Sequence, residues 1–293
     1  NFFGFHIQNK LIPTISSLKP DILLCMFDIR WVNSLLLFFK LRAFKNKYWW
    51  GADIGNNSLA TKLKSAILKL NVPVIFYSRS NMEKFLARGL DKSICHVANN
   101  TFDVGKRVEG YKYPKNSLLF VGTFDKRKQL DILVKSFDIV TRKLNSNVKL
   151  NLVGDGVEFD GINRLIESLG RKEDIILHGR INDADKLADL YKSALASVSF
   201  GQAGLSVLQS LGFGVPFVTK KNCISGGEVS NLIDGVNGFL IDDSMDSLSF
   251  TIEKLIGHPD LAVQLGENAF SYYSKNCTIE NMTKSFVDVF ESR

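Results

Sequence analysis

The stretch that decides the fold is residues 118–137, which read LLFVGTFDKRKQLDILVKSF. Residues 117–121 form a short, mainly apolar run of the kind that makes a buried strand, and Gly122 follows it as a turn. Three consecutive basic residues occupy positions 126–128, and residues 131–144 have the apolar spacing of a helix. A strand, a glycine turn and a helix in this order predict one unit of a parallel sheet.

The same alternation continues on both sides of this unit. Towards the C-terminus it predicts strands at 148–153, 175–178, 196–200, 215–219 and 238–240, helices at 161–169, 184–194 and 206–213, and two helices that close the chain. Towards the N-terminus it predicts strands at 21–27, 48–50, 72–77 and 94–98 and a helix at 80–88. Strands that alternate with helices of this length form parallel sheets covered on both faces, so the fold class is α/β.

A polar, irregular segment at 106–115 divides this pattern into two halves. We therefore expect two Rossmann-like domains, residues 1–105 and residues 106–293. Whether the last helix crosses back to the first domain stays open. The length of 293 residues suits two domains. The first residue is asparagine and no opening strand with a glycine turn precedes residue 20, so we expect the first domain to be incomplete at its N-terminus.

The composition narrows the class of protein. A hydrophobic share of 45% and a charged share of 23% are typical of a globular protein. The apolar run at 35–39 is far shorter than the roughly 20 residues of a membrane-spanning helix, and no signal peptide is recognisable. The four cysteines contain no C-x-x-C pair, which indicates reduced thiols rather than a disulfide framework. We therefore expect a cytoplasmic protein.

The charge is unevenly spread along the chain. Residues 1–110 hold 16 Lys and Arg against 7 Asp and Glu, whereas the remainder holds 21 against 23. Such asymmetry suggests two domains that face different partners. Residues 31–47 join an apolar stretch to four basic residues, which fits either a core helix with a basic end or a segment lying on anionic lipid. We expect no nucleic-acid partner. Two explanations of the basic charge stay open: a peripheral position at the inner membrane face, or a basic surface that is only solvated.

Three loops carry residues suited to binding phosphate and sugar. The basic residues at 126–128 follow a strand of an open α/β sheet, where ligands bind, and would neutralise a diphosphate. The glycine-spaced loop 201–206 leads into a helix whose free backbone N–H groups would cradle phosphate oxygens. Two glycines before Glu228 make a loop that can press this carboxylate against sugar hydroxyls.

Together these loops resemble the C-terminal domain of the group 1 (family four) retaining glycosyltransferases, which have the GT-B fold. Five segments stand in the family's order: LLFVGTFDKRKQLDILVKSF, LNLVGDGVEF, DIILHGRINDADKLADLYKSA, GLSVLQSLGFGVPFVT and GGEVSNLIDGVNGFLI. The resemblance is close over residues 118–290 and looser over 20–103, with 99–103 similar to the family's interdomain hinge.

The resemblance implies two Rossmann-like domains whose parallel sheets face each other across a cleft. It further implies a nucleotide diphosphate-sugar as co-substrate, no cofactor, and transfer with retention to a saccharide or lipid-linked saccharide in surface polysaccharide biosynthesis. Two alternatives remain, a nucleotide-sugar epimerase of the same fold and a non-catalytic relative that binds nucleotide-sugars.

Several donor-binding positions follow from the match residue by residue. Lys128 stands six residues after Gly122, where the family has its diphosphate-binding lysine. The family's arginine after that glycine is Thr123 here, so we expect Arg127 to supply the second charge. The resemblance also assigns donor contacts to Gly154, Arg180, Ile181, Gly201, Gln202, Gly204, Leu205, Ser206, Gln209 and Glu228.

The sequence departs from the family at its paired glutamates, which fall on Gly201 and Gln209. Gln209 can still hydrogen-bond a ribose hydroxyl, whereas Gly201 has no side chain to offer the sugar. This departure marks a divergent branch or an inactive relative.

The catalytic residues are less clearly marked. The family often places a histidine after a central strand of the first domain, but residues 49–56 read WWGADIGN and offer only Asp53. Asp28 and Arg30, after the strand at 21–27, are further candidates, and each of the three fits a structural role equally well. Residues 183–185 spell the D-x-D of metal-dependent enzymes but begin a helix, where aspartate is an ordinary cap, so we expect no metal.

Overall fold

The computed structural model describes residues 6–33, 35–36, 46–53, 58–70, 72–105 and 108–291. The chain divides into two compact units, a larger one of residues 101–281 and a smaller one of residues 1–100 with 282–293. The division falls between residues 100 and 101, rather than between 105 and 106, because Val104 and Val108 are buried in the core of the larger unit.

The smaller unit is a parallel sheet with helices, and its strands lie where the sequence predicted them. Its elements are α1 (Leu11–Leu18), β1 (Ile22–Met26), β2 (Asn46–Trp50), α3 (Ser58–Leu68), β3 (Val74–Phe76), α4 (Arg79–Leu86) and β4 (Cys95–Val97). The strands pair in the order β1-β2-β3-β4, all parallel. The core gathers around Trp49, Phe76 and Phe85. The sequence pattern did not predict α1 and α3, which the structure adds.

The larger unit is built on a six-stranded parallel sheet. Its elements up to the closing helices are β5 (Ser117–Val121), α5 (Leu130–Leu144), β6 (Lys149–Val153), α6 (Phe159–Ser168), β7 (Ile175–Gly179), α7 (Ala184–Ser193), β8 (Ala194–Val198), α8 (Ser206–Gly212), β9 (Phe217–Lys220) and β10 (Gly238–Ile241). The strand order is β10-β9-β8-β5-β6-β7. From β5 the chain adds β6 and β7 towards one edge of the sheet, and from β8 it adds β9 and β10 towards the other edge. The carboxyl ends of β5 and β8 therefore form a topological switch point, where open α/β sheets bind ligands.

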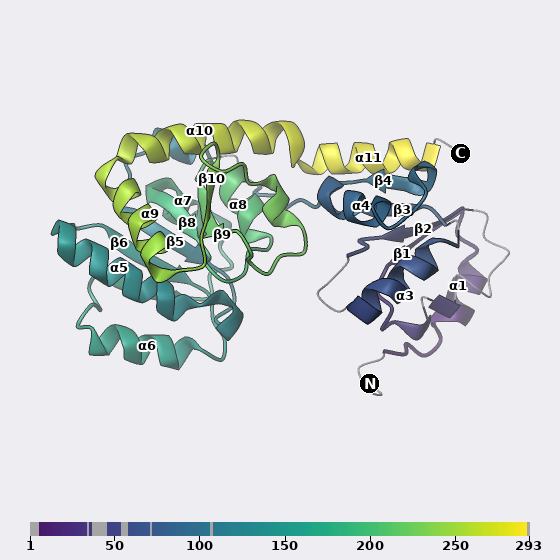
Figure 1. The fold of residues 1–293 in the computed structure, drawn as a ribbon, viewed down its shortest axis with the longest axis horizontal. Helices are drawn as coiled ribbons and strands as arrows, with labels where there is room; N and C mark the ends of the chain where they lie inside the picture. Colours follow the sequence, from purple (N-terminus) through teal and green to yellow (C-terminus); the bar gives the residue numbers. More distant parts are fainter. Residues whose placement is uncertain are drawn as a thin grey trace. The chain divides into compact units, whose positions relative to one another are not determined.

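Both faces of this sheet are covered by helices (Figure 1). Along β5, Leu118 and Phe120 pack into one buried cluster with residues of α5 and of α9 (Met245–Gly257). Leu119 packs into the other cluster with residues of α7 and α8. Successive side chains of a strand point to opposite faces, so a strand buried on both faces reads as a continuous apolar run. This burial explains why the sequence marked β5 so clearly.

Three helices close the chain, where the sequence predicted two. They are α9 (Met245–Gly257), α10 (Pro259–Asn276) and α11 (Ile279–Glu291). Proline at the first position of α10 separates it from α9, because proline suits the first turn of a helix but breaks an interior. From Met282 on, α11 belongs to the smaller unit, where Phe286 packs against Trp50.

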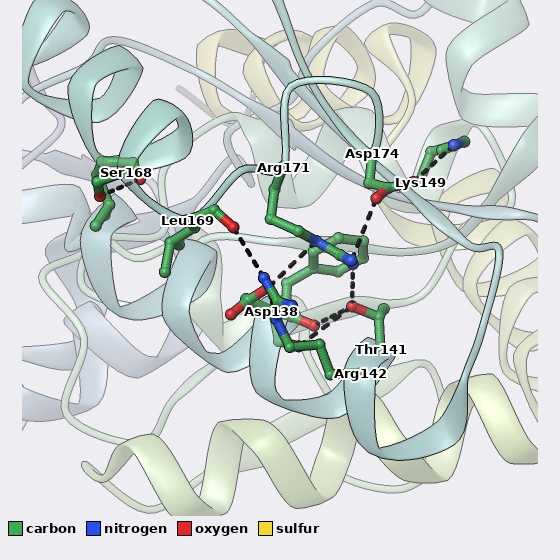
Figure 2. A network of polar contacts seen from close by, with 10 residues as sticks. Asp138, Thr141, Arg142, Lys149, Ser168, Leu169, Arg171 and Asp174 are labelled. Carbon is green, nitrogen blue, oxygen red and sulfur yellow. Dashed lines mark hydrogen bonds and ion pairs between the residues drawn. The ribbon is translucent and has the colours of Figure 1, made fainter.

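At the end of the sheet opposite to the switch point, Arg171 ties α5 to the start of β7 (Figure 2). Its guanidinium lies 3.2 Å from Asp138 Oδ1 and 3.3 Å from Asp174 Oδ2, and it donates to Thr141 Oγ1 across 2.6 Å. Arg142 Nε donates to the same oxygen of Asp138 across 2.8 Å. This polar cluster connects α5 to the start of β7, and it lies away from the loops described next.

Candidate functional site

Lys128 lies at the switch point, in a short 3-10 helix (Lys126–Lys128) that follows β5. Its side chain is buried, and its Nζ lies 3.4 Å from the carbonyl oxygen of Gln202, in the loop after β8. A Cβ placed on Gly122 would lie 3.7 Å from this Nζ, an ordinary contact distance, so the ammonium lies beside the glycine turn. Among the described residues, no carboxylate lies within ion-pair distance of Lys128. Burial lowers the pKa of Lys128, because a desolvated ammonium is costly.

Arg127, expected to provide a second charge, is held within its own loop. Its guanidinium lies 2.8 Å from Asp125 Oδ2 and is largely exposed. Thr123 is exposed as well, and its hydroxyl lies 3.3 Å from the same carboxylate oxygen. The charge of Arg127 is therefore balanced by Asp125, whereas that of Lys128 is not.

Two polar side-chain atoms with no partner in the described part of the chain lie after β8, one in the loop and one at the first residue of α8. Gln202 Oε1 and Ser206 Oγ are buried atoms without a hydrogen bond to any described residue. Buried polar atoms are normally paired, so unpaired ones in a loop mark a place where a ligand or water completes the bonding. Gly204 has open space around its Cα, and Leu205 beside it is exposed.

Gly154, Arg180, Ile181 and Glu228 lie on the loops around this position. Gly154 has φ 139°, and a Cβ there would lie 1.8 Å from the carbonyl oxygen of Gly122, so only glycine lets the loops after β5 and β6 meet. Arg180 is exposed directly after β7, and Ile181 is partly buried against the core. The Glu228 carboxylate accepts a hydrogen bond from Ser225 Oγ across 3.2 Å.

Gln209 is buried in α8, and its Oε1 accepts a hydrogen bond from the hydroxyl of Tyr191 across 3.2 Å. This hydrogen bond leaves the amide NH₂ as the end of the side chain that is available to a ligand. Tyr191 was not singled out in the sequence, because a buried tyrosine in a helix reads as a core residue. Asp183 caps α7, as expected from the sequence. His178 Nε2 lies 2.8 Å from Asn151 Oδ1.

In the smaller unit, the three candidate catalytic residues line one cavity of about 350 Å³ at the carboxyl ends of β1 and β2. Arg30 donates to Asp28 across 2.6 Å, and this hydrogen bond lowers the pKa of Asp28. Lys64 also lines the cavity and donates to the backbone oxygen of Asp53 across 2.6 Å. The cavity thus combines a carboxylate pair with an arginine and a lysine. Most of the segment 31–47, a candidate membrane contact, lies outside the described residues.

Comparison with known proteins shows the family of this chain. A family model described as glycosyl transferases group 1 matches residues 104–272, more than half of the chain. The chain belongs to the group 1 glycosyltransferases. The matched residues contain all three loops around Lys128.

Relatives of this glycosyltransferase are distant. Poly(ribitol-phosphate) alpha-N-acetylglucosaminyltransferase of Staphylococcus aureus (strain COL) is 23% identical over 199 residues, which cover 66% of this chain and 40% of that protein. Poly(glycerol-phosphate) alpha-glucosyltransferase of Bacillus subtilis (strain 168) is 24% identical over 226 residues, covering 75% and 33%. The structure of Anabaena HepE in complex with UDP matches with a TM-score of 0.76 at 18% identity, covering 97% and 82%. The chain spans less than half the length of the first two relatives, and the structural match shows the GT-B fold.

Position 201 of this glycosyltransferase has no room for a side chain. A Cβ on Gly201 would lie 2.1 Å from the carbonyl oxygen of Arg127, so the glutamate of the family pattern cannot be accommodated there unless the loop moves. Within the described ranges, no three His, Cys, Asp or Glu side chains gather as a metal ion would need, and no helix there is long and apolar enough to cross a membrane. Metal independence stays a prediction.

Proposed function

We propose that the larger unit of this glycosyltransferase binds a nucleotide diphosphate-sugar, with Lys128 as the main diphosphate contact. The observation that carries the proposal is the buried ammonium of Lys128 without a carboxylate partner among the described residues. An unpaired buried charge is costly and is retained where an anion completes it. The diphosphate is such an anion, and the switch point of an α/β sheet is where it would bind.

The reaction we propose is transfer of the sugar with retention of anomeric configuration. The bond between the anomeric carbon and the β-phosphate oxygen breaks. An acceptor hydroxyl oxygen bonds to the same carbon and gives its proton to an oxygen of the departing diphosphate. Negative charge builds on the departing diphosphate, where preorganised donors contribute most. To Lys128, the Ser206 hydroxyl and the backbone N–H groups of residues 204–206 we assign the stabilisation of this charge. Retention rests on the family resemblance.

The acceptor would be a saccharide or a lipid-linked saccharide in surface polysaccharide assembly. Two relatives carry names that state transfer to poly(ribitol phosphate) and poly(glycerol phosphate), which are hydroxyl-rich anionic polymers. The cavity of the smaller unit offers Arg30 and Lys64 for anionic groups, and the carboxylates of Asp28 and Asp53 for hydroxyl groups. We therefore assign acceptor contacts to this cavity.

A non-catalytic role in nucleotide-sugar binding is the second candidate. Gly201 has no room for a side chain, and Gln209 is engaged by Tyr191, so neither supplies the carboxylate of the family pattern. The two candidates share the Lys128 contact and differ in turnover.

Incubation with a panel of UDP-, GDP- and ADP-sugars, alone and with lipid-linked saccharide acceptors, separates these functions. Release of the nucleotide diphosphate with a glycosylated product supports transfer. Conversion of the donor to its epimer indicates an epimerase, and binding without any product indicates the non-catalytic role. A protein that binds none of these nucleotides would contradict the whole proposal.

A further inference from the structure

Gln129, directly after Lys128, has an unusual backbone conformation. Its φ of 54° and ψ of 46° are left-handed, and it joins the 3-10 helix of residues 126–128 to α5. A side chain makes this conformation costly, whereas glycine adopts it freely. Strained residues of this kind persist where the surroundings hold them, and they cluster at functional sites. The contacts of the Gln129 side chain are therefore informative.

The side chain of Gln129 contacts Lys220, a buried lysine that pairs with the exposed Asp243. Its Oε1 accepts a hydrogen bond from Lys220 Nζ across 3.0 Å, at the end of β9. The same ammonium lies 2.9 Å from both carboxylate oxygens of Asp243 and 5.3 Å from the centre of the Phe200 ring. Lys220 is buried, so its ammonium has little freedom to take another position. Lys220, the last residue of β9, thus connects Gln129, which follows β5, to Asp243, which follows β10.

Gln129 lies where a side chain at position 201 would lie. A Cβ on Gly201 would be 2.9 Å from both Cγ and Oε1 of Gln129. Because Gly201 lacks that atom, its N–H reaches the carbonyl oxygen of Lys128 at 3.2 Å. The Gly201 carbonyl in turn accepts from the N–H of Ile224 across 3.0 Å. The Gln129 side chain can therefore pack in this position only because position 201 is glycine and not the glutamate of the family pattern.

Lys128 is consequently held at two points by the loop that Gln129 packs against: its carbonyl by Gly201 and its Nζ by Gln202. We infer that Gln129, held by Lys220 and Asp243, is a positioning residue that sets Lys128 for the donor diphosphate, in the space of the missing glutamate. This inference rests on the proposed function. It adds that the position of Lys128 depends on a contact from β9.

The test uses Gln129→Gly as its main variant, because glycine removes the side chain and also relieves the left-handed strain. Lys220→Met breaks the same contact from the other side. Lys221→Met is the matched control: Lys221 is the next residue, and it pairs with the exposed Asp242 at 2.7 Å. For each variant, UDP affinity is measured by calorimetry with GDP and ADP alongside, thermal stability is recorded, and hydrogen exchange of the amides at 126–130 is followed without nucleotide.

We expect Gln129→Gly to weaken UDP binding about five- to tenfold at an unchanged or higher Tm, with faster exchange at 126–130. Lys220→Met should weaken binding similarly, and Lys221→Met should leave it unchanged. Wild-type affinity in Gln129→Gly would overturn the inference and leave the proposed function intact, and equal weakening in Lys221→Met would overturn it too. A wild-type protein that binds no nucleotide would instead refute the proposed function and, with it, the assignment of Lys128 to a diphosphate.

Discussion

Tyr191 donates its hydroxyl hydrogen to Gln209 Oε1 across 3.2 Å, and both side chains are buried in the larger unit. The bond fixes which end of the Gln209 amide faces the proposed donor site. It also makes the residue at position 209 part of the core as well as of the site.

Tyr191→Phe should therefore affect both stability and donor binding. An unsatisfied buried acceptor costs roughly 1–3 kcal/mol, so we expect a loss of about that size in the free energy of unfolding. Freed from Tyr191, the Gln209 amide can rotate, and donor KM should rise severalfold. Urea unfolding and donor kinetics measure the two effects.

Gln209→Met in the Tyr191→Phe background is the control for this pair. Because it replaces the remaining polar partner by an apolar side chain of similar volume, it should recover part of the lost stability. Strictly additive losses in this double-mutant cycle would show that the two side chains do not interact.

Lys128→Met should weaken nucleotide binding without lowering the stability of the protein. Loss of a charge-assisted contact of roughly 1.5–3 kcal/mol should weaken nucleotide diphosphate affinity about ten- to a hundredfold. Removal of a buried ammonium without an ion-pair partner should leave the free energy of unfolding unchanged or raise it. Lys126→Met, two residues earlier and exposed, should alter neither in calorimetry and urea unfolding. Destabilisation by Lys128→Met with unchanged affinity would assign Lys128 a purely structural role.

Arg171→Met should destabilise the larger unit strongly without touching the site. The change leaves Asp138, whose side chain is only 10% exposed, with Arg142 as its one remaining ion-pair partner. We expect a loss of about 2–4 kcal/mol in urea unfolding, near the lower end for a broken buried ion pair. Lys172→Met, next in the chain, breaks an exposed pair with Glu167 and should cost less than about 1 kcal/mol. Similar losses in the two variants would mean that solvent screens the Arg171 cluster as it does a surface pair.

Lys115 should make stability depend on alkaline pH. Its Nζ donates to the backbone oxygens of Gly110 and Lys192, and burial lowers the pKa of Lys115 to about 8. The unfolded chain keeps a pKa of about 10.4 and so binds more protons between these values. The free energy of unfolding should therefore gain a term that rises from pH 8 to about 10.4 and is flat below pH 8.

Lys115→Met should lack this rise, so the quantity to measure is the difference between wild type and variant across that range. Cys277 opposes the trend, since burial raises its pKa to about 12 and stability then falls as the unfolded thiol ionises. This contribution is common to both proteins and cancels in the difference. A difference that does not change with pH would show that Lys115 titrates normally.

Contact of the segment 31–47 with anionic lipid would give salt-dependent membrane binding. Vesicles with acidic lipid should bind the protein at low salt and release it at 1 M, where the Debye length is about 3 Å. Replacement of Lys40 and Arg42 by serine should weaken this binding. Equal sedimentation with neutral and acidic vesicles would count against the electrostatic contribution.

The elements that follow from neighbouring residues could be predicted from the sequence. The apolar run of β5, the turn at Gly122 and the helical spacing of α5 are local patterns, and each was confirmed. The helices α1 and α3 and the division of the closing segment into three helices were not predicted. Capping and packing decide where these helices begin and end, so the spacing of apolar residues does not predict their boundaries.

The sequence alone determined the α/β class and the succession of strands and helices along the chain. It also contained the spacing from Gly122 by which the family resemblance pointed to Lys128. Only the tertiary structure decided what surrounds that lysine. Lys220 reaches Gln129 from 91 residues away, and Tyr191 reaches Gln209 from the neighbouring strand–helix unit. Periodicity and turn chemistry act between residues close in the chain, whereas the contact of Lys220 with Gln129 exists because the parallel sheet brings the carboxyl ends of β5 and β9 to one edge.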